Sequence, residues 1–392
     1  MSLGILFFSV LFFGLYASKL VAKFRLPGVL GMVFVGGVIG HYVGDNLPAS
    51  FDESATFLKS LALTIILLKA GLGISVDQLR RAGRAAVLMT FVPCLFEGAA
   101  LTYIFHWLFG FDWAVAGLTA FMIAAVSPAV VVPTMLEMKA KGFGKKREVP
   151  TIVLAGASVD DVIAITLFSV CLGLATTGDS AIGAALLSIP TSIIIGLIPG
   201  LVLGMVLAWV FTRFSVSMIE KVLLLLTLSV LLVEVGHYFE SAALLGVMAV
   251  GFILLEHAQK SANELASLLG HLWFFAQIVL FVLIGMSVDL GVAMESGAMG
   301  LLAITLGLVA RSIGVMVATQ FSSLNLKERL FCVVAYLPKA TVQAALGGVA
   351  LAAGVPEGQT ILALAVLAII FTAPLGLIGI TTFAPRLLEK DE

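Results

Sequence analysis

Residues 150–176 read PTIVLAGASVDDVIAITLFSVCLGLAT. The segment is mostly apolar, and its only charged residues are Asp160 and Asp161 near its centre. As a helix it is long enough to cross about 30 Å of hydrocarbon, at about 1.5 Å per residue. At the centre of a bilayer each carboxylate costs at least about 2.5 to 3.5 kcal/mol. If the chain is a membrane protein, a pair of carboxylates in this helix indicates a functional site.

The composition of the whole chain indicates a membrane protein. Hydrophobic residues make up 61% of the 392 residues and charged residues 11%, and the mean hydropathy is +1.16. Soluble domains carry roughly 25% charged residues, so a soluble chain of this composition could not cover its surface. The formal net charge of −1 gives no indication of nucleic-acid binding. Cys94, Cys171 and Cys332 show no metal-ligand spacing, and we expect no cofactor.

The apolar stretches predict an all-α polytopic membrane protein with thirteen transmembrane helices. We expect these helices at residues 2–18, 27–44, 54–73, 86–109, 112–136, 150–176, 181–212, 221–238, 241–256, 268–287, 297–320, 329–354 and 359–383. Basic residues lie in alternate connections, most densely at 19–25, 80–84 and 139–147, whereas the opposite connections carry acidic residues and no Lys or Arg. By the positive-inside rule we expect the N-terminus outside and the C-terminus in the cytoplasm, in a multi-pass protein of the cell (inner) membrane.

A short repeat predicts that the two halves of the chain are related. The pentad Gly73-Ile74-Ser75-Val76-Asp77 recurs as Gly285-Met286-Ser287-Val288-Asp289. Glu97 and Arg311 follow their pentads at similar distances, and so do Pro128 and Pro338. Because the two pentads fall on opposite sides of the membrane, we predict an inverted repeat, an architecture in which transporters bind substrate near the midplane.

Prolines predict two interrupted helices at matching positions of the repeat. The span 112–136 contains Pro128 and Pro133, and the span 329–354 contains Pro338. Each proline removes a backbone donor and clashes with the preceding turn. In a membrane the freed backbone groups must line a polar cavity. We therefore expect two broken helices.

Four further charged residues lie deep in the spans, namely Glu97, Glu234, Arg311 and Lys339. Arg311 could pair with Glu97, its counterpart in the repeat, or face Asp160, and the sequence does not choose between these partners. A pair of Glu97 and Arg311 is equally compatible with a structural and a functional role. Lys339 follows Pro338 directly, and we favour a role in offsetting half-helix ends or carboxylates over a role as proton carrier. Glu234 lies near the end of its span and is expected to reach the interface.

Asp160 and Asp161 project about 100° apart on a helix, so one can face a cavity while the other turns toward a basic partner. In a low-dielectric site their desolvation and mutual repulsion make them titrate as a coupled unit. Such a unit can hold a proton or a hard cation such as Na⁺ or Li⁺. Competition between proton and cation for one site produces exchange.

Four motifs resemble a known family. They are Val126–Pro133 (VSPAVVVP), Ser158–Asp161 (SVDD), Leu283–Gly285 (LIG) and Leu337–Ala344 (LPKATVQA). With these motifs the chain resembles the cation/proton antiporter superfamily with NhaA-like fold, most closely its NHA-type sodium/proton exchanger branch. The resemblance covers nearly the whole chain.

The resemblance implies a homodimeric sodium/proton antiporter, not an enzyme, with a role in pH homeostasis. Na⁺ or Li⁺ and H⁺ would compete at Asp160, Asp161 and Ser127, with Asp161 as the main carrier. A core that contains two crossed broken helices would move against a scaffold like an elevator. The expected parts are a scaffold at 1–83 and 221–290, a core at 84–176 and 291–384, a connecting helix at 177–220 and a cytoplasmic tail at 385–392. Many relatives carry Lys where this chain has Arg311, and Arg cannot act as a proton carrier.

Three other functions are compatible with parts of the pattern. A cation-coupled symporter of a small organic solute shares the repeat and is the main alternative. An ion channel needs a continuous pore, usually built by symmetric subunits, rather than broken helices. An intramembrane aspartyl protease needs carboxylates from different helices, whereas Asp160 and Asp161 are consecutive.

Overall fold

The computed structural model describes residues 3–24, 28–43, 47, 51–177, 182–239, 243–286 and 297–390. Within these residues the chain forms helices and one isolated antiparallel bridge, between Phe143 and Lys390. The chain divides into two compact units. Unit 1 comprises Met1–Gln78 and Pro190–Ser287, and unit 2 comprises Leu79–Ile189 and Val288–Glu392. Two helices contribute residues to both units, α4 (Val76–Met89) and α9 (Ile182–Arg213).

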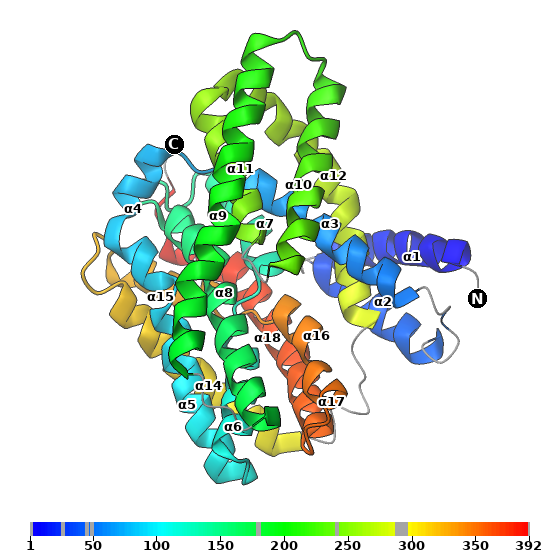
Figure 1. The fold of residues 1–392 in the computed structure, drawn as a ribbon, viewed down its shortest axis with the longest axis vertical. Helices are drawn as coiled ribbons and strands as arrows, with labels where there is room; N and C mark the ends of the chain where they lie inside the picture. The colour runs from blue at the N-terminus through cyan, green and yellow to red at the C-terminus, as the bar shows by residue number, and fades with distance from the viewer. Residues whose placement is uncertain are drawn as a thin grey trace. The chain divides into compact units, whose positions relative to one another are not determined.

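Unit 1 is a group of apolar helices in which α12 is central. Besides its part of α9, its helices are α1 (Leu3–Lys23), α2 (Gly28–Val43), α3 (Phe51–Gly71), α10 (Met218–Tyr238), α11 (Ala243–His257) and α12 (Gln259–Met286). α12 packs against α1, α2 and α3, and α11 packs against α3 (Figure 1). The contact of α2 with α12 depends on Gly36 and Gly285, because a Cβ on Gly285 would lie 2.9 Å from the Cα of Gly36. Small residues of this kind let membrane helices approach closely.

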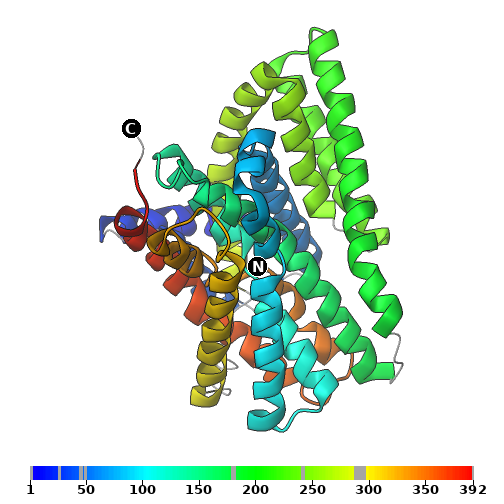
Figure 2. The same cartoon turned by 90° about the vertical axis from the view of Figure 1, so that its left-hand side faces the viewer.

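Unit 2 contains Glu97, Asp160, Arg311 and Lys339, the buried charged residues that the sequence places deep in spans. Besides parts of α4 and α9, its helices are α5 (Val92–Phe109), α6 (Trp113–Ala124), α7 (Pro128–Ala140), α8 (Val149–Thr177), α14 (Gly297–Ala318), α15 (Leu326–Ala335), α16 (Thr341–Leu346), α17 (Val349–Ala352) and α18 (Gly358–Leu387). α5 packs against both α6 and α14, and Figure 2 shows α5 (cyan) beside α14 (gold). α8 packs against α6 and α7. Asp112 caps α6, because its side chain accepts a hydrogen bond from the Ala114 N–H at 3.1 Å.

Several predicted spans differ from the helices of the structure. The span 112–136 is divided into α6 and α7, and the span 329–354 into α15, α16 and α17. The span 86–109 begins inside α4 and is interrupted before α5. Pro93 in the first turn of α5 explains this start, because a helix tolerates a missing N–H there. α4 itself contains a non-helical Gly83 with φ 55°.

In the described part of the chain, nine helices are long and apolar enough to cross a membrane. Three shorter apolar helical stretches, Gly28–Val43, Ala243–His257 and Thr341–Leu351, fall below that length. The expected thirteen transmembrane helices therefore remain a prediction. The inverted repeat also remains a prediction, since Ser287, Val288 and Asp289 of the second pentad lie outside the described residues.

Candidate functional site

The two interrupted helices of unit 2 meet at their breaks. α6 ends at Ala124, and the chain is extended at Ala125 before α7 begins at Pro128. The second break lies between α15 and α16, where Pro338 forces the preceding residue out of helical geometry. The Ser127 N–H donates a hydrogen bond to Pro338 O at 2.8 Å. A freed backbone group of one break is thus satisfied by the other, which fixes the two breaks side by side.

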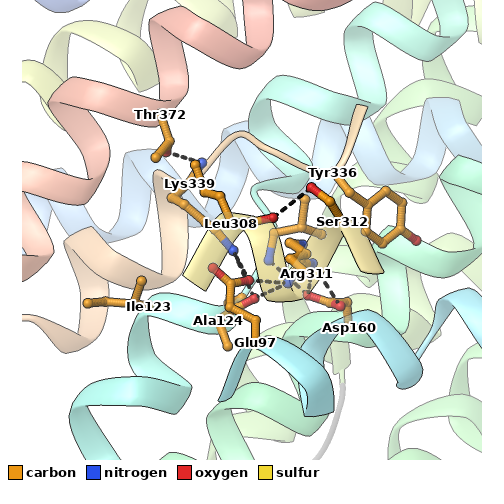
Figure 3. A network of polar contacts seen from close by, with 12 residues as sticks. Glu97, Ile123, Ala124, Asp160, Leu308, Arg311, Ser312, Tyr336, Lys339 and Thr372 are labelled. Atoms are coloured by element: carbon orange, nitrogen blue, oxygen red, sulfur yellow. Dashed lines mark hydrogen bonds and ion pairs between the residues drawn. The ribbon is translucent and has the colours of Figure 1, made fainter. Parts of the chain in front are cut away.

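Four buried charged side chains gather beside these breaks (Figure 3). Glu97 comes from α5, Asp160 from α8, Arg311 from α14, and Lys339 from the second break. Glu97, Asp160 and Lys339 are fully buried, and Arg311 is 1% exposed. Buried charges need both an opposite charge and hydrogen bonds to offset their desolvation. All four have these partners within the group.

Arg311 makes both of the contacts that the sequence left as alternatives. Its Nη1 lies 2.7 Å from Glu97 Oε2, and its Nη2 lies 3.0 Å from each oxygen of Asp160. Nη1 also donates to Ala124 O, at the end of α6. The face of the Tyr336 ring lies 5.2 Å from the guanidinium carbon. A planar donor fork that joins two carboxylates is a geometry that lysine could not reproduce.

Lys339 offsets both a carboxylate and a half-helix end. Its Nζ lies 2.6 Å from Glu97 Oε2 and 3.0 Å from Ala124 O. Its backbone N–H donates to Thr372 Oγ1 on α18 at 2.9 Å, which anchors the break to that helix. These are the contacts of a charge-compensating residue. Its role in transport stays a prediction.

Asp160 and Asp161 have different surroundings. Asp160 accepts from Arg311 through both oxygens, and its Oδ2 also accepts from the Val126 N–H at 2.8 Å. By contrast, Asp161 Oδ1 is buried and has no hydrogen-bond partner among the described residues. The hydroxyl of Ser127, next to Val126 in the first break, is also buried and unpartnered within that part of the chain. The site therefore contains one occupied carboxylate and one with free coordination capacity.

Gln343 is a polar residue of this site that the sequence did not single out. It is 1% exposed, and its Nε2 donates to three carbonyl oxygens at the end of α6. The available signal was a lone amide side chain in the otherwise apolar stretch 342–353 that follows the break at Pro338. Glu234 lies in α10 of unit 1, is exposed, and is not part of this cluster.

Comparisons with known proteins agree with this architecture. Residues 7–385 match the family model described as "Sodium/hydrogen exchanger, transmembrane". The chain belongs to this family. The exchanger is 34% identical to human Sodium/hydrogen exchanger 9B2 over 382 residues, which cover 94% of this chain and 71% of the human protein. It is 31% identical to human Sodium/hydrogen exchanger 9B1, over 93% of this chain and 73% of that protein.

The fold of the exchanger is also found among solved structures. The sodium proton antiporter MjNhaP1 from Methanocaldococcus jannaschii at pH 8 superposes with a TM-score of 0.74, at 21% identity and over 96% of both chains. A second MjNhaP1 structure, determined by electron microscopy, gives a TM-score of 0.81 at 19% identity over the whole of both chains. The expected membership of the cation/proton antiporter superfamily is confirmed, and the exchanger is an all-helical, multi-pass membrane protein of an antiporter family.

Proposed function

We propose that this exchanger moves Na⁺ or Li⁺ in one direction and H⁺ in the other by binding them alternately at Asp161. The difference between the two aspartates carries the proposal. Asp160 is held by Arg311 and by the Val126 N–H, so it positions the site. Asp161 Oδ1 has no hydrogen-bond partner in the described structure and is free to bind a proton or a cation.

The charge of the cluster favours one bound monovalent ion. Three carboxylates, on Glu97, Asp160 and Asp161, face two cations, on Arg311 and Lys339. Fully ionised, the cluster carries a net charge of −1. In such surroundings a unit charge about 4 Å away is worth about 4 kcal/mol at an effective dielectric of 20. One H⁺ or one Na⁺ neutralises the cluster, whereas both together would bring its net charge to +1. The two ions therefore exclude each other.

Ser127 is the second ligand in this proposal. Its hydroxyl is buried and has no hydrogen-bond partner in the described part of the chain. It follows Val126, whose N–H binds Asp160, and it precedes α7 at the first break. Hydroxyl and carboxylate oxygens are hard ligands of the kind that Na⁺ and Li⁺ require. Water would complete the coordination of the cation.

Alternating access follows from the competition, because two ions that share one site cannot cross together. We expect the core at 84–176 and 291–384 to carry the site past the scaffold at 1–83 and 221–290, with 177–220 as connection. The presence of two compact units supports this division of roles. A homodimer held by the scaffold, with the N-terminus outside and the C-terminus in the cytoplasm, completes the proposal.

The experiment measures the collapse of a pH gradient in proteoliposomes when NaCl or LiCl is added. We expect Asp161→Asn to abolish the response, because an amide can neither be protonated nor carry the charge that binds the cation. Asp160→Asn should weaken the response severely by removing the counter-charge of Arg311. Asp112→Asn is the matched control, since Asn also caps helices, and it should behave as wild type. A wild-type response from folded Asp161→Asn protein would refute the proposal.

A further inference from the structure

The C-terminal end of α6 is covered by side chains from the second half of the chain. A helix leaves its last carbonyl groups without partners inside the helix. Here the two N–H groups on Nε2 of Gln343 serve three carbonyl oxygens, at 2.9, 3.1 and 3.1 Å, which belong to Met122, Ile123 and Ala125, so one N–H is shared. The side chain is 1% exposed, so these hydrogen bonds are shielded from solvent.

The remaining carbonyl of this end is covered by charged groups. Ala124 O accepts from Lys339 Nζ at 3.0 Å and from Arg311 Nη1. Together with the contacts of Gln343, every carbonyl from Met122 to Ala125 accepts a hydrogen bond from a side chain of the second half. A cation would have to compete with these side-chain donors for the four carbonyls from Met122 to Ala125.

Carbonyl oxygens without donors at the end of α6 would give the cation a second place to bind. Half-helix ends in transporters are ligands for cations, because they carry partial negative charge and free oxygens. A cation held by carbonyls does not compete with a proton, because a carbonyl does not titrate near neutral pH. A cation held by Asp161 does compete. Occupying these carbonyls therefore favours binding of the cation at the titratable carboxylate of Asp161, whose Oδ1 has no hydrogen-bond partner in the described structure.

A glutamine provides this cover without adding charge. The cluster of Glu97, Asp160, Asp161, Arg311 and Lys339 carries −1 when fully ionised. A lysine in place of Gln343 could donate to the same carbonyls, but it would bring the total to zero. The attraction for a cation would then be lost. The side-chain amide of Gln343 supplies N–H donors and carries no charge.

We propose that Gln343 is a positioning residue that directs the transported cation to Asp161 by occupying the carbonyl oxygens at the end of α6. Gln343 keeps the competition between cation and proton strict. This inference rests on the proposed function. The two can fail separately. Active Asp161→Asn protein refutes the proposed function. If Asp161→Asn protein is inactive, the variants of Gln343 decide the inference.

The first test is Gln343→Met, which keeps a similar length and removes the donors. Half-saturating Na⁺ for exchange in proteoliposomes is measured over a range of acidic pH. Strict competition raises it about tenfold for each unit fall in pH. With the carbonyls uncovered, we expect a rise below about threefold per unit. The slope is a ratio within one variant, so a partial loss of folded protein does not change it. Gln320→Met, at an exposed glutamine, should keep the wild-type slope.

The second test is Gln343→Lys, which keeps the donors and adds a charge. We expect the wild-type slope, with half-saturating Na⁺ raised about tenfold or more at every pH. This variant also decides the question if Gln343→Met does not fold. A wild-type slope in Gln343→Met, or a wild-type half-saturating concentration in Gln343→Lys, would overturn the inference.

Discussion

Asp160 and Asp161 show how much one residue step matters in a helix. Their place in an otherwise uncharged segment predicts from sequence that they are functional. The sequence also predicts that one of them faces a basic partner, because neighbours on a helix point about 100° apart. The identity of the partner was not predictable, since the position of Arg311 relative to Asp160 and Glu97 depends on the packing of three helices.

Glu97 and Arg311 allow a stability test at this scale. Removing one member of a buried pair costs up to about 3 to 5 kcal/mol, although here Asp160 still faces Arg311 and Lys339 still faces Glu97. We expect Glu97→Gln and Arg311→Gln each to lower the melting temperature strongly, and the double variant to lower it by less than the sum of the two. The measurement is thermal unfolding of purified protein in detergent.

The exposed pair Glu137 and Lys141 is the control for this cycle. The two residues are four positions apart on α7 and its end, with side chains 51% and 54% exposed. The corresponding double-variant cycle should show coupling of at most about 0.5 kcal/mol. Strict additivity at Glu97 and Arg311, at the level of this control, would mean that the buried contact does not contribute to stability.

At the scale of elements, sequence predicts interruptions better than helix ends. Pro128 and Pro338 predicted both breaks of the site. The break before α5 was missed, although Pro93 in the first turn of α5 was a usable signal. α12 begins at Gln259 rather than at 268, because its polar first turns are helical but not apolar. A span estimated from hydropathy measures the apolar part of a helix and not its full length.

The contact of α2 with α12 yields a prediction about packing. A Cβ on Gly285 would collide with Val33 O and lie 2.9 Å from Gly36 Cα, and backbone atoms cannot move aside as a side chain can. We expect Gly285→Ala to lower the free energy of unfolding by about 1 to 3 kcal/mol, a typical cost of overpacking. Gly173→Ala in α8 is the control, because a Cβ there meets nothing within 4 Å. Equal melting temperatures for the two variants would contradict the close approach.

At the scale of the whole molecule, the sequence predicted a division of the chain into parts. The resemblance to the antiporter superfamily implied a core and a scaffold, and that assignment stays a prediction. The structure contains two compact units whose boundaries follow Gln78, Ile189 and Ser287. Neither the sequence nor the structure shows which unit moves in transport, because movement is a difference between two conformations. It requires a measurement in which the movement is blocked.

Crosslinking provides that measurement. Cysteine pairs with one member in each unit are screened for complete disulfide formation, and sodium-driven proton movement is measured before and after reduction. If unit 2 carries the site past unit 1, every pair that locks the units together should stop exchange, and reduction should restore it. A pair within unit 2, Phe143→Cys with Lys390→Cys, joins residues that already form a bridge and should be tolerated. Undiminished exchange with the units fully locked would leave local opening at the breaks beside Ser127 and Pro338 as the route for the ions.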